Sequence, residues 1–540
     1  MTDAPHESPA AEPLRPPTAG RIARSAAMVI GILTFGKAFS LIEKWIGLDR
    51  FGVGREWDTF TAANQLPSQL YILISGGALA YAFIPIFSGL LSKGARDSAW
   101  KLTSNVVNTV FLTALFLSVI VFFTAPWLVA NVTAPGFAQG ADGAAKVAQT
   151  ANLMRILLLS LILFSISGLV SGVLHTHQTF LYPALSPIFY DVGNLIGVAI
   201  LARFMGIYGA AVGAVIGAAL HLAIQIPGLI RIRARWQPYL NWRNAELRQV
   251  ITLMIPRAVG LSLANLNLLV AGNIASRLAE GSTAAFDRGY ALMQIPQTII
   301  GTAMGLVIFP TLALLSARDD LDGKRTAMSG SLRFILTAAI PAAVLLAVGG
   351  RPFVAILEGG AFDSAGVSRV FFVLQLFALG IVTQSALEIV ARAFYADKDM
   401  VVPLAAQLVE VVCNIGFAFL FVAWFQVAGL GLANSLAVGI ELLILILVLR
   451  RRWKGIHEGV LLTTLLKTSL ASAVMAAVMI AFAPTINGIT PFSDPRLLNA
   501  FHGGVQLALG VIVFVGMAFL LRMREIGEIR RLLFQRAVKP

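Results

Sequence analysis

The sequence contains few charged residues and a single cysteine. Asp, Glu, Lys and Arg make up 13% of its 540 residues, whereas hydrophobic residues make up 57%. A water-soluble domain of this composition would expose more apolar surface than water tolerates, so the lipid bilayer is the expected solvent. A single cysteine excludes an internal disulfide and a cysteine metal cluster, and this residue, Cys413, stands in an apolar run.

Common catalytic motifs are also missing from the sequence. Neither HExxH nor GxSxG occurs, and the string GILTFGK at 31–37 resembles a phosphate-binding loop but is followed by Ala38 instead of Ser or Thr. We therefore expect no cofactor and no ATPase, but a transporter driven by an ion gradient or the membrane potential, with Na+ or H+ as the coupling ion. A membrane enzyme is disfavoured, because no loop exceeds roughly two dozen residues or carries a convincing cluster of Asp, Glu and His.

Long apolar runs are what the sequence has in abundance. They are continuous rather than alternating, which favours helices over the strands of a barrel. Each run reaches the roughly 20 residues that are needed to cross a bilayer. We predict an all-α polytopic membrane protein with spans near 26–47, 60–91, 103–131, 152–174, 180–204, 207–230, 249–278, 286–316, 331–357, 367–394, 401–424, 428–449, 460–484 and 500–521.

Lys and Arg gather in alternate loops between these runs, with an imbalance of roughly three to one. The positive-inside rule places the basic loops and both termini in the cytoplasm, which requires an even number of spans. Orientation therefore explains the net charge of +14 better than nucleic-acid binding does. Residues 1–20 are rich in Pro and Ala, which predicts a disordered tail, and 523–540 form a basic cytoplasmic tail.

The sequence contains an internal repeat. The segment from Pro183 aligns with the segment from Pro403 at an offset of 220 residues, and the same register pairs His221 with Glu441. Two parallel six-helix lobes related by a pseudo-two-fold axis suit alternating access; shared descent without transport is the alternative. The predicted parts are an N-lobe at 21–232, a linker at 233–248, a C-lobe at 249–454, and helices thirteen and fourteen at 455–522, which form a lipid groove or merely stabilise the bundle.

Polar side chains inside the predicted spans are the candidate functional residues, because such groups are costly at bilayer depth and usually face a wet cavity. The alternative is interhelical hydrogen bonding or structural ion pairing. The glycines at 209, 213 and 217 predict close helix packing. The candidates for a substrate cavity are Lys37, Asp58, Asn64, Gln65, Gln69, Arg257, Asn265, Gln294 and Gln297, and those for ion coupling are Glu388, Glu410 and Asp191.

Several strings resemble the MviN/MurJ family of lipid II flippases. They are the segment Trp57–Leu90, VTAPGF at 132–137, LMQIP at 292–296 and AFYADKDMVVP at 393–403. The resemblance covers essentially the whole chain and implies membership of the multidrug/oligosaccharidyl-lipid/polysaccharide exporter superfamily. It implies a flippase that carries the undecaprenyl-diphosphate-linked peptidoglycan precursor across the bacterial cytoplasmic membrane, with the cell-wall synthesis machinery as a candidate partner.

The sequence departs from the family at the cations expected to face the diphosphate. Tyr71 and Ala291 stand where the family usually has arginine, Lys37 replaces one span-one arginine, and Glu43 replaces the other. Lysine binds phosphate as a point charge without the bidentate fork of arginine. A flippase for another polyprenyl-linked glycan, and a drug or cation antiporter with an acidic cavity, are therefore kept as alternatives.

Overall fold

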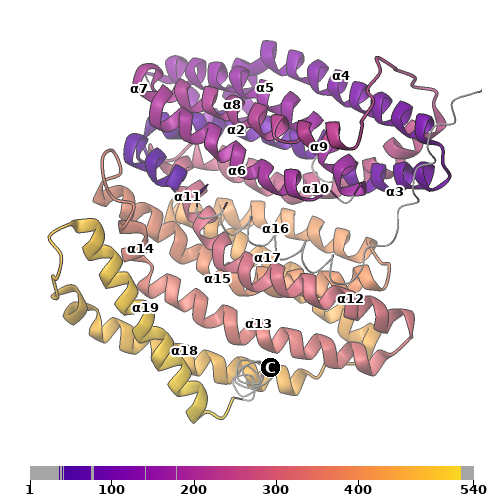
Figure 1. Ribbon diagram of the computed structural model, residues 1–540. Coiled ribbons are helices and arrows are strands. Elements are labelled where there is room, and N and C mark those ends of the chain that lie inside the picture. The colour runs from indigo at the N-terminus through magenta and orange to yellow at the C-terminus, as the bar shows by residue number, and fades with distance from the viewer. Residues whose placement is uncertain are drawn as a thin grey trace, which may run out of the picture. The chain divides into compact units, whose positions relative to one another are not determined.

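The computed structural model describes residues 36, 39, 40, 42–74, 78–139, 141–177 and 179–523. Apart from one isolated bridge between Gly359 and Phe362, this part of the chain is helical and contains no strand (Figure 1). Ten of its helices are long and apolar enough to cross a membrane. The predicted all-α polytopic fold is confirmed, whereas the count of fourteen spans stays a prediction.

The first half of the chain forms long helices that are interrupted by irregular turns. In the second predicted span, the structure describes residues 55–74 and 78–92 as helical. The helices are α2 (Arg55–Ile74), α3 (Ala78–Ser92), α4 (Arg96–Leu128), α5 (Gly143–Thr176), α6 (Leu181–Ile196), α7 (Ala202–Met205), α8 (Ile207–Ala223) and α9 (Ile226–Arg231), with π-helical turns at Val129–Thr133 and Gly197–Leu201 and a 3-10 turn at Pro135–Ala138.

The second half repeats this pattern and adds two helices. The span that corresponds to α2 and α3 contains a π-helical turn at Thr298–Thr302. The helices are α10 (Ala245–Ala275), α11 (Ser282–Gln297), α12 (Ala303–Ala317), α13 (Leu321–Gly349), α14 (Arg351–Ala355), α15 (Ser364–Ala396), α16 (Val401–Phe425), α17 (Ala428–Trp453), α18 (Glu458–Asn487) and α19 (Pro495–Leu520).

The described chain divides into two compact units, whose boundaries fall inside helices. The first unit contains Pro67–Ala125 and Met154–Ser262. The second contains Trp45–Leu66, Pro126–Leu153 and the chain from Leu263 onward. Two short pieces of the first half of the sequence therefore pack with the second half.

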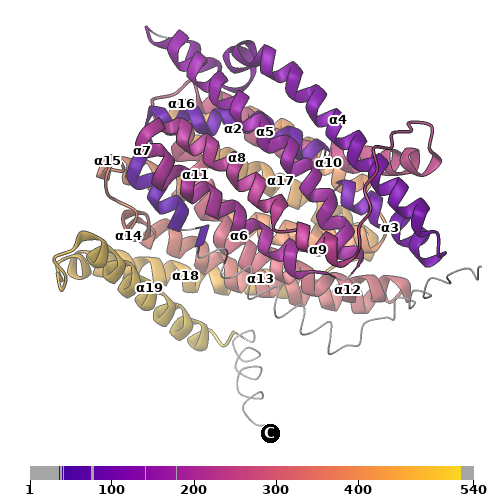
Figure 2. The ribbon, with the colours of Figure 1, turned by 45° about the horizontal axis from the view of Figure 1, so that its top comes forward.

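Within the first unit, α6 and α8 lie side by side with their backbones in close approach (Figure 2). A methyl group added at Gly193 would lie 2.2 Å from the Cα atom of Gly217, and one added at Gly213 would lie 2.4 Å from Gly197. No side chain fits at either position without separating the helices. The close packing predicted from the glycines at 209, 213 and 217 is confirmed.

Within the second unit, α15 is the central helix and packs against α11, α13 and α17. The two helices outside the repeat, α18 and α19, lie along α13 on the side away from α15 (Figure 1). Their contact is a small apolar cluster in which Met475, Met479 and Phe514 are buried. This cluster fixes the two added helices to the repeat.

Candidate functional site

A buried carboxylate, Glu410 on α16, is bonded to two asparagine side chains. It is only 3% exposed. Nδ2 of Asn267 on α10 donates to its two oxygens at 2.9 and 2.6 Å, and Nδ2 of Asn414 donates at 3.3 Å. Glu410 and Asn414 are one turn apart and therefore share a face of α16. Among the ion-coupling candidates, Glu410 has the most enclosed polar environment.

A second buried carboxylate, Glu441 on α17, lies within range of the charge on Glu410. Two carboxylates in one apolar interior repel each other unless a proton or a cation neutralises one of them. Oδ1 of Asn267 has no hydrogen-bond partner among the described residues, and rotation of this amide would turn the oxygen toward Glu410. Carboxylate and amide oxygens suit a hard cation, so this cluster has the chemistry to hold Na+ or a proton.

Asp58 forms a buried carboxylate site that is separate from the Glu410–Glu441 cluster and lies at the start of α11. Its side chain is 2% exposed, and its oxygens accept hydrogen bonds from the backbone N–H groups of Gly281 at 2.6 Å and Ala284 at 2.8 Å. In return, Oε1 of Glu280 accepts a hydrogen bond from the N–H of Arg55, the first residue of α2, at 3.0 Å. We call this arrangement the reciprocal cap, because each helix start is satisfied by a carboxylate from the other chain segment.

The other polar candidates on α2 lie along its length. Gln65 contacts α10 closely: a methyl group added at Gly272 would lie 1.8 Å from Nε2 of Gln65. Asn64 and Gln69 are half-buried. A contact between these side chains and a substrate stays a prediction.

The proline-flanking glutamines lie where α11 ends. Pro296 is inside the last turn of α11, and the π-helical turn at Thr298–Thr302 follows directly. Such turns are rare and often occur at functional sites. Gln294 is exposed and hydrogen-bonded to Tyr290, whereas Gln297 is half-buried. An irregular helical turn therefore follows the proline, which removes one backbone hydrogen bond from the span.

The remaining candidates are placed separately. Lys37 and the side chain of Arg257 lie outside the described residues. Asn265 and Asp191 are half-buried and have interaction partners. Glu388 is half-buried and forms an ion pair with Arg392 on the same helix at 3.0 Å.

The structure buries Arg288 on α11, and this residue is not among the candidates drawn from the sequence. Its guanidinium carbon lies 4.6 Å from the ring centroid of Trp57. The residue is 7% exposed. Arg288 stands inside the apolar run at 286–316, and a charge at such a position was the available signal.

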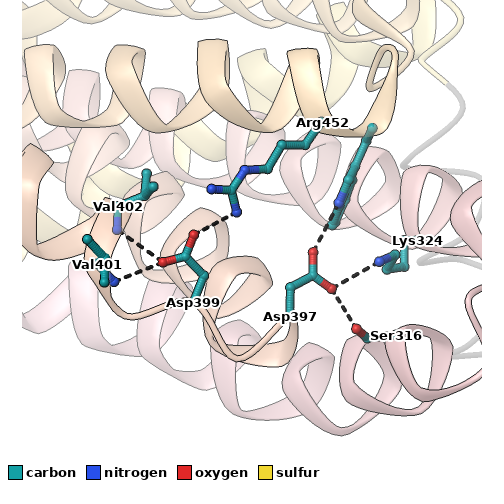
Figure 3. A network of polar contacts seen from close by, with 8 residues as sticks. Ser316, Lys324, Asp397, Asp399, Val401, Val402 and Arg452 are labelled. Atoms are coloured by element: carbon teal, nitrogen blue, oxygen red, sulfur yellow. Dashed lines mark hydrogen bonds and ion pairs between the residues drawn. The ribbon is translucent and has the colours of Figure 1, made fainter.

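The string AFYADKDMVVP forms a network of charged contacts between helix ends (Figure 3). Oδ1 of Asp397 accepts hydrogen bonds from Ser316 at 2.6 Å and Lys324 at 2.9 Å, and Oδ2 accepts one from the Trp453 ring at 3.2 Å. Burial opposes ionisation of Asp397, but these hydrogen bonds outweigh it and hold its pKa below the ordinary value. We call Ser316, Lys324, Asp397 and Trp453 the ionic corner.

Asp399 extends the same network two residues further along. Oδ1 accepts hydrogen bonds from the backbone N–H groups of Val401 at 2.8 Å and Val402 at 3.1 Å, and Oδ2 pairs with Arg452 at 2.6 Å (Figure 3). Asp399 therefore caps α16 while it holds the last turn of α17. Burial acts against its ionisation, but the backbone hydrogen bonds and Arg452 prevail, so its pKa is also lowered.

Comparison with known proteins gives one consistent result. A family model described as "Lipid II flippase MurJ" matches residues 49–493. A relative of that name from Burkholderia cenocepacia is 28% identical over 435 residues, which are 78% of this chain and 83% of the relative. A "probable lipid II flippase MurJ" from Rhizobium tropici is 25% identical over 528 residues, which are 95% of this chain and 97% of the relative.

Solved structures show the same fold. A lipid II flippase MurJ in an inward closed conformation superposes with a TM-score of 0.76 at 22% identity, over 92% of this chain and 99% of that one. An inward-facing multidrug transporter of the MATE family superposes with a TM-score of 0.63 at 14% identity, over 79% of this chain and 98% of that one. At these identities the similarity concerns the fold alone.

Proposed function

The chain belongs to the lipid II flippase MurJ family, and from this premise we propose that it translocates lipid II by alternating access. The substrate is the undecaprenyl-diphosphate-linked peptidoglycan precursor. The protein is a multi-pass protein of the bacterial inner membrane, and ten of its described helices are long and apolar enough to span the bilayer. In our proposal the lobes at 21–232 and 249–454 are the moving bodies, both termini are cytoplasmic, and Lys37 contributes a cation to the cavity.

The observation that carries the mechanism is the reciprocal cap. It ties the start of α2 to the start of α11 through two buried hydrogen bonds to Asp58 and one exposed hydrogen bond to Glu280, between residues more than two hundred positions apart. By the predicted topology, both helix starts belong to the outer side of the membrane. We propose that the reciprocal cap is the closed outer gate, which must break each time the cavity opens outward.

Glu410 is our proposed coupling-ion site. Its carboxylate is buried with two asparagine amides, and Glu441 adds a second carboxylate in the same interior. Gain or loss of one proton or one Na+ changes the electrostatic energy of this cluster far more than it would in water. A gradient of either ion could therefore bias the lobes between conformations.

Transport of lipid II in proteoliposomes tests the proposal. We expect the wild type to flip lipid II with a rate that depends on a Na+ or proton gradient, and Glu410→Gln to lose at least about tenfold of the gradient-driven rate. Glu388→Gln is the matched control, because it removes another glutamate from a span but one that is paired with Arg392. Its rate should fall less than that of Glu410→Gln.

Two results would contradict the proposal. A wild type that flips no lipid II, and that fails to replace an essential lipid II flippase in growing cells, would remove the assigned substrate. A Glu410→Gln variant that keeps the full ion-dependent rate would remove the proposed coupling site while leaving the transport assignment intact.

Cation antiport is the second candidate function, and the paired carboxylates favour it. Glu410 and Glu441 place negative charge inside the second half of the chain, as a carrier of organic cations requires. Efflux of a cationic dye by the same proteoliposomes separates the two functions. We expect no dye efflux and no competition between the dye and lipid II, whereas dye efflux without lipid II transport would favour the antiporter.

A further inference from the structure

Arg288 and Trp57 form a buried pair beside the reciprocal cap. Arg288 is the seventh residue of α11, and Trp57 is the third residue of α2. The guanidinium lies over the indole at 4.6 Å, and Trp57 is itself 5% exposed between the rings of Phe51 and Phe60. A permanent cation thus lies against a buried indole where the two helix starts meet.

Three donor nitrogens of this pair have no acceptor among the described residues: Nε and Nη2 of Arg288 and Nε1 of Trp57. The cation–π contact satisfies the face of the guanidinium but leaves its N–H edge unbonded. Buried donors without acceptors are rare in native proteins, and each calls for an explanation. The carboxylate of Asp58 is bonded to backbone N–H groups, and Asp287 is exposed.

The identity of the unbonded atoms indicates the ligand. Nε and Nη2 lie on one edge of the planar guanidinium, and their N–H bonds point the same way. This fork matches two oxygens of one phosphate or carboxylate group. An oxyanion offers one oxygen to each of the two parallel bonds, whereas a halide offers a single acceptor atom to both, so the geometry favours an oxyanion.

We propose that the Nε–Nη2 edge of Arg288, together with Nε1 of Trp57, binds a phosphate oxyanion when α2 and α11 separate. The proposal rests on the proposed function in one respect, namely that the reciprocal cap opens during transport. With the cap closed the pair is covered, and with the cap open the fork faces the path between the two helix starts. The oxyanion is either the diphosphate of the lipid-linked substrate or free inorganic phosphate.

Thermal unfolding of the purified full-length protein tests the site, with inorganic pyrophosphate as the probe and potassium chloride at equal ionic strength as the reference. Pyrophosphate should raise the unfolding midpoint of the wild type. Arg288→Gln should weaken the apparent pyrophosphate affinity by roughly tenfold or more, since it removes a charge-assisted bidentate contact. Arg288→Lys should recover part of this affinity, and Trp57→Phe, which keeps an aromatic ring but loses Nε1, should lose roughly threefold.

Arg155→Gln is the matched control. Arg155 also lies over an aromatic ring, that of Phe122 at 5.1 Å, but its Nε already donates to a backbone carbonyl. Its removal should leave the pyrophosphate affinity unchanged. Size-exclusion chromatography shows whether the Arg288→Gln variant is folded. If the folded variant bound pyrophosphate as tightly as the wild type, the site would be refuted.

A second measurement identifies the source of the oxyanion and separates this proposal from the proposed function. If the wild type bound undecaprenyl diphosphate more tightly than pyrophosphate, and Arg288→Gln lost this preference, the oxyanion would be the lipid-linked diphosphate. If the wild type bound both equally, the oxyanion would be free phosphate. Both results support the site. A wild type that binds pyrophosphate through Arg288 but flips no lipid II would refute the proposed function alone. Lipid II transport with unchanged binding in Arg288→Gln would refute the site alone.

Discussion

The two halves of the chain close the same corner of the repeat with different chemistry. In the first unit, four rings contact one another with centroids 5.1 to 6.0 Å apart, and we call Phe83, Phe87, Trp100 and His177 the aromatic corner. In the second unit, the ionic corner holds Lys324 and Asp397 at 2.9 Å.

The positions of these residues correspond between the two copies. His177 and Asp397 each stand six residues before the paired prolines Pro183 and Pro403. Trp100 is the fifth residue of α4, and Lys324 is the fourth residue of α13. The comparison teaches that the repeat preserves where helices begin and turn, whereas the side chains that fill the corner can change from apolar to charged.

The largest expected effect is on the aromatic corner. Trp100 is 7% exposed and stacks on His177 with an interplanar angle of 17°. Trp100→Ala should lower the free energy of unfolding by about 3–5 kcal/mol, because the cavity left by an indole cannot fully collapse. Unfolding in mixed micelles measures this loss, and Trp100→Phe, which keeps a ring, is the control with a smaller loss.

Truncation of a side chain in the ionic corner should lower the unfolding free energy less than Trp100→Ala does. The corner should also tolerate replacement of both charged residues by apolar ones. Asp397→Leu leaves the ammonium of Lys324 without its carboxylate, which should cost about 2–3 kcal/mol of unfolding free energy. The double variant Lys324→Met/Asp397→Leu removes both charges and should return to within about 1 kcal/mol of the wild type. A double variant as unstable as the single one would show that the ionic corner needs its charges and is not interchangeable with the aromatic corner.

The fold was accessible from the sequence because its signals are local. Apolar runs of bilayer length predict the helices, and the glycines at 209, 213 and 217 predict the tight contact of α8 with α6. Both signals come from residues within a few turns of one another. Proline has the same local character, because its missing N–H group disturbs only the adjoining turns, and a π-helical turn follows Pro296.

The partners of the polar residues were not accessible, because they depend on tertiary contacts. Asp58 is a candidate cavity residue by its sequence position, but its acceptor role toward Gly281 joins residues 223 positions apart. Helical periodicity groups Asn265 with Asn273 and separates Asn267 from them, yet it does not say which face of α10 meets α16. The structure shows that the Asn267 face carries the contact with Glu410.

The smallest expected effect is a difference in acid sensitivity between the corners. Because the hydrogen bonds to Asp397 hold its pKa below the ordinary value, this group stabilises the fold fully above the pKa of the unfolded chain, about 3.9. The stabilisation is lost as the pH falls through the lower pKa of the folded state. The difference in unfolding free energy between the wild type and Asp397→Asn should therefore be constant from about pH 8 to 5 and shrink below about pH 4.

This change should be less than about 1 kcal/mol, because Asp397 is 21% exposed and solvent screens part of the interaction. The aromatic corner contains no carboxylate among its four residues, so the difference between the wild type and Trp100→Phe should stay constant between about pH 5 and 3. If the two differences in unfolding free energy, one for Asp397→Asn and one for Trp100→Phe, changed equally with pH, Asp397 would contribute no proton-linked stability. The ionic corner would then differ from the aromatic corner in shape alone. If only the Asp397→Asn difference changed with pH, the charged corner would make one half of the repeat lose stability in acid through a carboxylate that the aromatic corner of the other half does not contain.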